Sequence, residues 1–260
     1  MKSPLVWWLM LCVCAAAQTA PQTVPTTAAP AGVEITSEPS HHLVLKNRTV
    51  RVFRVEVAPK AATLMHRHRH DYLFVTLGDS ELRNERRGEK PADLRLTEGD
   101  VRFTKGGFAH IARNLGDAPF RNVTIEVLRP ARGIVSLATC DIDEGIECGF
   151  CSISPEGKQK CDWPEATETL PELEKKEQDY GIYQFVVHLQ PGSTTGMHTH
   201  KVDHLLVAVS DLELKNEVQG KPAELIRLKS GEVRWVKGGV THSLTNLGEQ
   251  PAWWVSFEFK

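Results

Sequence analysis

The sequence predicts an all-β protein made of two tandem jelly-roll β-barrels, and three observations support this. The chain repeats itself at an offset of 132 residues, so that Met65–His68 (MHRH) returns as Met197–His200 (MHTH). Within each copy, short apolar or alternating segments are separated by turns that contain glycine, which is typical of strands. Helical periodicity is scarce outside 171–178. A unit of roughly 90 residues that occurs twice is a duplicated domain, because solenoid repeats are much shorter.

The amino-terminal segment is expected to be processed and flexible. Lys2, an apolar run and Ala15–Ala17 resemble a signal peptide over 1–17, so we expect the protein to be exported to the periplasm or the extracellular space. Residues 18–37 are rich in Pro, Thr and Ala, which predicts a disordered tether.

Each predicted barrel has its own strand signals. The first barrel is expected over 38–129, where 50–58 alternates apolar and charged residues. The second is expected over 179–260. The segments 73–77 and 205–209 are almost continuously apolar, which is typical of strands buried on both faces. Many short, evenly spaced strands favour closed barrels.

The connector, 130–178, contains the four cysteines that remain after the leader, Cys140, Cys148, Cys151 and Cys161. In an exported protein such a cluster favours disulfides, with three pairings open. Structural zinc is the alternative, but the second closely spaced pair of a four-cysteine site is missing.

The composition restricts the class of partner. The chain is 41% hydrophobic and 25% charged, with a formal net charge of -2, which is typical of a globular protein and gives no sign of a nucleic-acid partner. The leader is too short to span a membrane comfortably. We expect a small-molecule substrate or ligand as the partner. The apolar outer strands also allow a homodimer through a barrel edge.

Histidines recur in both copies with the spacing of metal ligands. Alternate residues of a strand face the same side, so His66 and His68, or His198 and His200, can point into a barrel together. A histidine from a facing strand would complete each set, His110 in the first copy and His242 in the second. Three imidazoles suit a divalent transition metal and leave positions open for substrate. In the alternative interpretation the histidines only fill the barrel interior, and this suits the first copy better.

These motifs resemble the cupin superfamily, and two-domain cupins (bicupins) in particular. Gly192 followed by His198-Thr-His200 is similar to the first cupin motif. The stretches 99–114 and 231–246 are similar to the second motif, with Lys105 and Lys237 in place of its proline. The resemblance covers nearly all of 38–128 and 179–259. It implies bound Fe, Mn, Zn or Ni.

The sequence departs from the cupin pattern at the position where the family most often has a glutamate ligand. Tyr72 and His204 stand there, preceded by Asp71 and Asp203. In a regular strand Tyr72 and His204 face inward, whereas a bulge would turn the aspartates inward. His204 is therefore both a candidate fourth ligand and, like Tyr72, a candidate catalytic acid or base. Either aspartate could instead orient a ligand histidine.

Three functions are compatible with these residues. Without the glutamate, the ligand set resembles that of three-histidine cupins, some of which are oxygen-using iron enzymes. This resemblance implies an oxygenase or related oxidoreductase that acts on a small oxygenated molecule. A lyase or isomerase acting on a sugar or uronate is the second hypothesis. A non-enzymatic metal or ligand receptor is the third.

Other recurring polar residues are predicted to lie outside any site. His41, His42, His70 and His188 are expected at surfaces or before strands, and Asn84 and Asn216 are expected to solvate a sheet edge. Lys105 and Lys237 are interpreted as solvated turn residues.

Overall fold

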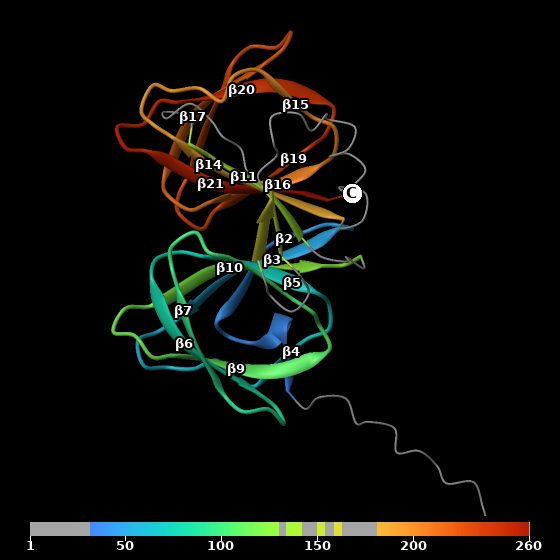
Figure 1. Cartoon of the computed structure of the whole chain (residues 1–260), viewed down its shortest axis with the longest axis vertical. Helices are drawn as coiled ribbons and strands as arrows, with labels where there is room; N and C mark the ends of the chain where they lie inside the picture. Colours follow the sequence, from blue (N-terminus) through green and yellow to red (C-terminus); the bar gives the residue numbers. More distant parts are fainter. Residues whose placement is uncertain (1–31, 130–133, 142–149, 154–158, 163–180, 260) are drawn as a thin grey trace, which may run out of the picture.

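Two β-barrels lie one above the other along the long axis of the molecule (Figure 1). The computed structural model describes residues 32–129, 134–141, 150–153, 159–162 and 181–259. Among these residues the only helical element is the short 3-10 turn η1 (Ile35–Ser37), and all other regular structure is strand. The predicted all-β class with tandem jelly-roll barrels is confirmed.

The first barrel consists of two five-stranded sheets. One has the order β1-β4-β9-β6-β7, and the other β2-β3-β10-β5-β8. The strands are β1 (Val33–Glu34), β2 (His41–Lys46), β3 (Val50–Val57), β4 (His66–His68), β5 (Tyr72–Thr76), β6 (Ser80–Arg86), β7 (Ala92–Leu96), β8 (Val101–Thr104), β9 (Phe108–Asn114) and β10 (Phe120–Val127).

The second barrel repeats this arrangement, and strands from the connector extend it. Its sheets have the orders β13-β12-β11-β14-β21-β16-β19 and β15-β20-β17-β18. The strands are β11 (Ile134–Asp141), β12 (Phe150–Ile153), β13 (Gln159–Asp162), β14 (Ile182–Leu189), β15 (His198–His200), β16 (His204–Ala208), β17 (Leu212–Val218), β18 (Glu224–Leu228), β19 (Val233–Val236), β20 (Val240–Asn246) and β21 (Ala252–Phe259).

The segments flanking the barrels are partly built into them. The end of the predicted tether is ordered, since β1 pairs in parallel with β4 and Ile35 is 1% exposed. The connector strand β11 pairs in parallel with β14, and β12 and β13 pair with Cys151 opposite Cys161. Disulfide pairing itself stays a prediction. The signal peptide and the periodic stretch 171–178 lie outside the described residues.

The largest apolar cluster lies between the barrels. It joins side chains of β3, β5 and β10 to side chains of β16 and β21, and its fully buried members include Val52, Ile125, Val207 and Phe257. Alternate residues of the same strands face the barrel interiors, because side chains of a strand alternate between its two faces. Two smaller apolar clusters fill one part of each interior, around Phe53 in the first barrel and Leu214 in the second.

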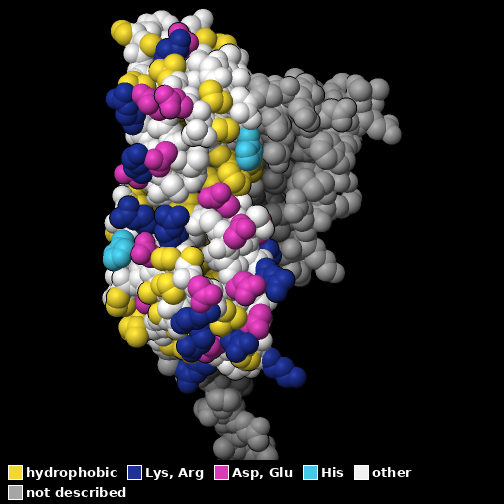
Figure 2. All heavy atoms as spheres, turned by 90° about the vertical axis from the view of Figure 1, so that its left-hand side faces the viewer, with side chains coloured by type: hydrophobic (Ala, Val, Ile, Leu, Met, Phe, Trp, Pro, Cys, Tyr) yellow, Lys and Arg dark blue, Asp and Glu magenta, His cyan; other side chains and the backbone are white. Residues whose placement is uncertain are grey.

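The outer surface has mixed charge. Figure 2 shows acidic and basic side chains interspersed over one face of both barrels, in keeping with the net charge of -2. Among the described residues, no helix is long and apolar enough to cross a membrane.

Two equivalent turns bring the barrels into contact. Gly99 and Gly231 have φ values of +78° and +83°, in the left-handed region that favours glycine. A Cβ on Gly99 would lie 1.9 Å from Cζ2 of Trp253 in the other barrel, and one on Gly231 would lie 2.8 Å from Cδ1 of Leu77. In each barrel a glycine turn therefore packs against a large side chain of the other barrel.

We predict that Gly99→Ala lowers the free energy of unfolding by about 3 kcal/mol, from the strained φ and from the clash with Trp253. Gly88→Ala is the matched control: its φ is +82°, and no atom lies within 4 Å of the added Cβ. It should cost about 1 kcal/mol, from strain alone. Urea denaturation measures both, and equal losses would contradict the inter-barrel contact.

Candidate metal centres

Three histidines of each barrel converge, two from one short strand and one from the strand paired with it. His66 lies opposite His110 in the β4–β9 pair, and His198 lies opposite His242 in the β15–β20 pair. The third histidine therefore comes from a neighbouring strand of the same sheet. The prediction that it comes from a facing strand is wrong. Ring centroids are 4.5 Å apart for His66 and His110, and 4.7 Å apart for His198 and His242.

Hydrogen bonds fix the orientation of these rings. Nδ1 of His66 lies 2.9 Å from the Leu64 carbonyl oxygen, and Nδ1 of His198 lies 3.0 Å from that of Gly196. A carbonyl oxygen only accepts, so each Nδ1 must carry the proton. Each Nε2 is then left with a lone pair directed into the barrel.

The histidines on β9 and β20 are held in the same way by asparagines. Nδ1 of His110 lies 2.7 Å from Oδ1 of Asn84, and Nδ1 of His242 lies 2.8 Å from Oδ1 of Asn216. The expectation that these asparagines only solvate a sheet edge is wrong. Their recurrence at the same position in both copies was the signal that pointed to the site.

In the second barrel His200 completes the set. Its Nδ1 lies 2.7 Å from Oε1 of Glu258, so it also donates from Nδ1. Its Nε2 lies 3.1 Å from Nε2 of His198. At this distance the two nitrogens either share a proton or can bind one cation together. Burial lowers the pKa of His198, so a proton on that ring is disfavoured.

The buried ring nitrogens of both sites fit a metal ion. Nε2 of His66, His110 and His242 is buried and has no hydrogen-bond partner within the protein. Such atoms are costly unless a partner satisfies them, which argues against histidines that only fill the interior. The donor set of neutral imidazoles suits a transition metal, and the acceptors behind the rings provide the support that metal sites require.

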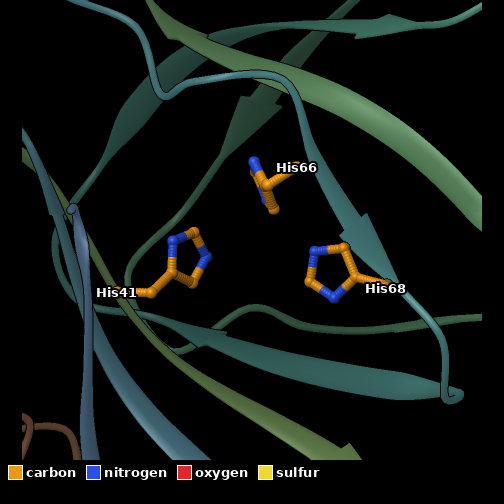
Figure 3. Close-up of side chains that lie close together, drawn as sticks. All are labelled: His41, His66 and His68. Carbon is orange, nitrogen blue, oxygen red and sulfur yellow. The ribbon is translucent and has the colours of Figure 1, made fainter. Parts of the chain in front are cut away.

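The first barrel brings a fourth histidine to its site. His41 on β2 offers a nitrogen that lies, with one each from His66 and His68, in a group whose members are all within 4.8 Å of one another. Figure 3 shows the three rings turned toward one another. Nδ1 of His41 lies 2.6 Å from Oε2 of Glu38. The prediction that His41 lies outside any site is wrong.

No signal in the repeat could have identified His41. It precedes the recurring motifs, and its position in the site depends on how β2 pairs with β3. His188, by contrast, packs against Trp253, with ring centroids 4.5 Å apart.

Tyr72 and His204 both face the histidines. Tyr72 stacks on His68 and His204 stacks on His200, each with ring centroids 3.9 Å apart. His204 lies outside the group of three nitrogens, which consists of His198, His200 and His242. Burial raises the pKa of Tyr72 to about 12 and lowers the pKa of His204 to about 3, so both are neutral near pH 7.

The aspartates beside them point away from the sites. Asp71 pairs with Lys105 at 2.9 Å, and Asp203 pairs with Lys237 at 2.7 Å. Each aspartate also accepts a backbone hydrogen bond from the following turn, at Gly106 or Gly238. The suggestion that these aspartates orient ligand histidines is wrong, and the two lysines anchor a turn through an ion pair.

Buried glutamates take the place of those aspartates behind the second histidine of each pair. Glu258 accepts a hydrogen bond from His200. In the first barrel Oε1 of Glu126 lies 3.8 Å from Nδ1 of His68, which is too far for a hydrogen bond, and neither atom has a hydrogen-bond partner within the protein. Glu126 also pairs with Arg51 at 2.6 Å. Burial raises the pKa of Glu126 to about 7. The sequence analysis missed both glutamates because they lie on the last strand of each barrel, far along the chain from the histidines.

The first site opens into a cavity of about 400 Å³. Its lining includes His66, His68, His110 and Tyr72 together with several cationic side chains. His66 and His68 are 1% and 2% exposed, whereas His198 and His200 are only half-buried. The first site is therefore the more enclosed of the two.

Comparison with known proteins agrees with this architecture. No protein-family profile matches the sequence, and no curated protein matches it. Among solved structures, AerE from Microcystis aeruginosa superposes with a TM-score of 0.53 at 12% identity, covering 86% of this chain and 98% of that one. Bacillus subtilis oxalate decarboxylase gives a TM-score of 0.51 at 12% identity, covering 92% and 80%. The chain has the fold of a two-domain cupin, with histidine clusters that could hold metal ions in both barrels.

We predict that Asn216→Leu weakens metal binding in the second barrel by roughly 10- to 100-fold, because His242 loses the acceptor that fixes its proton on Nδ1. Asn216→Asp keeps an oxygen acceptor and should retain most of the affinity. Competition with a chelator measures this. Equal affinities for Asn216→Leu and wild type would show that the hydrogen bond does not orient a ligand.

The metal-free protein should lose stability as the pH falls below about 6.5. Burial lowers the pKa of His66 and of His242 to about 4, so between pH 6.5 and 4 only the unfolded chain takes up these protons. At pH 5 each histidine should cost about 2 kcal/mol. Glu126, with its pKa raised to about 7, acts in the opposite direction between pH 7 and 4.5.

Urea midpoints at pH 7.5 and 5 test this. His204→Phe is the comparison, because burial lowers the pKa of His204 to about 3 and His204 should contribute to the same loss. Phenylalanine preserves stacking on His200 and cannot titrate, so this variant should show a smaller loss between the two pH values. An identical loss in the variant would mean that His204 does not contribute to the pH dependence.

Proposed function

We propose that this chain is an exported metal-dependent enzyme that acts on a small oxygenated organic molecule, with a divalent transition metal ion held by three histidines in each barrel. The observation that carries the proposal is the convergence of His198, His200 and His242, whose ring nitrogens all lie within 4.8 Å of one another, with Nε2 of His198 3.1 Å from Nε2 of His200. A bound metal ion would supply Lewis acidity and open positions for substrate.

The first barrel is the better candidate for catalysis. Its histidines are enclosed, and its cavity of about 400 Å³ is within the range of small-molecule sites. His66 and His68 would hold the ion together with His41, whose nitrogen lies within 4.8 Å of theirs, or with His110, whose ring centroid lies 4.5 Å from that of His66. Enclosure excludes water and strengthens electrostatic interactions with a bound substrate.

An oxygenase or related oxidoreductase is the reaction class we favour. The ligand set consists of neutral imidazoles, because Tyr72 and His204 stand where a charged carboxylate would complete a cupin site. Such a set leaves the charge of an iron ion largely uncompensated by the protein, so anionic substrate or oxygen species would bind to it favourably.

A lyase or isomerase is the second candidate, and the position of Tyr72 favours it. Its phenol is neutral, lines the cavity and stacks on His68, so it can donate a hydrogen bond to a bound substrate. The likeness to oxalate decarboxylase is in keeping with this class, and one solved structure of that enzyme concerns its Mn(II) centres. Substrate turnover without oxygen would favour this candidate.

The first test is metal content by elemental mass spectrometry on the exported, oxidised protein. We expect close to one ion per barrel, with one lost in His66→Ala and one in His198→Ala. His42→Ala is the control, because His42 is exposed on the same strand as His41. Iron accompanied by oxygen uptake would support the oxygenase. Absence of metal from both barrels would leave only a non-enzymatic binding barrel.

A further inference from the structure

Arg86 is placed where it can bind a substrate of the first barrel. It ends β6 and lies directly opposite His110 in the β6–β9 pair. Its side chain lines the same cavity as the histidines and Tyr72. The guanidinium carbon lies 4.0 Å from the centroid of the Phe108 ring, which holds it over an aromatic face. Arg86 is therefore a positioned cation in the wall of the site.

The other cationic side chains of the cavity have close carboxylate partners. Arg83 pairs with Asp93 at 2.7 Å, and Lys105 pairs with Asp71 at 2.9 Å. Arg102 lies 3.3 Å from Asp100. The contact of Arg86 with Glu89 is longer, 4.0 Å, and Glu89 is 60% exposed. The charge of Arg86 is thus the least compensated of the four.

The second barrel lacks this feature. Val218 lies opposite His242 in the β17–β20 pair, at the position that Arg86 occupies opposite His110. The two barrels share the asparagine that holds this histidine, two residues earlier on each strand. They differ in the next side chain on the same face of the strand.

We propose that Arg86 makes the first barrel selective for a small carboxylate, which it anchors beside the histidines while the second barrel has no such selectivity. This inference rests on the proposed function and names its substrate class. A guanidinium binds a carboxylate through two parallel hydrogen bonds, which gives it direction as well as charge. When both oxygens of one carboxylate bind Arg86, the rest of the substrate would face His110 and Tyr72.

The test compares oxalate with oxamide, its uncharged analogue of similar shape, by calorimetry on the metal-loaded protein. We expect the wild type to prefer oxalate, and Arg86→Gln to weaken oxalate binding at least tenfold without changing oxamide binding. Arg83→Gln is the matched control, since Arg83 lines the same cavity but is paired with Asp93; its affinity should stay within twofold. Arg86→Lys should retain part of the selectivity.

Two results would overturn the proposal: equal oxalate affinity in wild type and Arg86→Gln, or no preference of the wild type for oxalate over oxamide. A merely structural role of Arg86 would lower the unfolding midpoint and weaken both ligands together, leaving the ratio of their affinities unchanged. That outcome would also count against the proposal.

The metal-free protein separates this proposal from the proposed function. Metal content is measured again after each titration, because oxalate itself binds metals. Selectivity that depends on Arg86, in a protein that is found to take up no metal in either barrel, would support the anion site and contradict the enzyme proposal. Bound metal together with an unaffected Arg86→Gln variant would do the reverse.

Discussion

The apolar layer between the two barrels is the interaction on which the rest of this structure depends. Along β10, Val123, Ile125 and Val127 pack against the second barrel, while Asn122 and Glu126 face the interior of the first. The part of the interior that contains histidines, amides and a buried carboxylate provides little hydrophobic stabilisation. Packing the opposite faces of the same strands against another barrel provides it instead.

This arrangement also fixes the wall of each site that faces the ligand histidines. The strands that contribute Tyr72, His204, Glu126 and Glu258 are each paired with a neighbour on both sides in the packed sheets. Their outer faces are fixed by inter-barrel contacts, so their inner side chains have little freedom to move. Sites built on packed strands are held more accurately than sites built on loops.

Much of the fold and part of the site could be predicted from the sequence, because both are encoded locally. The repeat predicted two equivalent domains, period-two alternation predicted their strands, and the spacing of His66 and His68 placed two rings on one face. His41 and Glu126 could not be assigned in this way, because their approach to the histidines depends on strand pairing across the barrel. Asp71 was misassigned because its true partner, Lys105, lies 34 residues further along the chain.

The two barrels share the support of their histidines but differ in what surrounds them. In both, a carbonyl and an asparagine hold two protons on Nδ1, so the lone pairs that could bind a metal are set by hydrogen bonds present in each copy. Around this common core the first barrel adds His41, held by Glu38, and a cavity wall with Arg86.

These additions come from outside the histidine motifs, so they can vary without disturbing the ligands. His41 reaches the site from the edge strand β2, and Arg86 extends beyond Asn84 at the end of β6. A duplicated barrel can in this way keep one ligand geometry while its two walls select different molecules. The two barrels differ in this way. The first has enclosed histidines and a cationic wall, whereas the second has half-buried histidines and Val218 in place of the arginine.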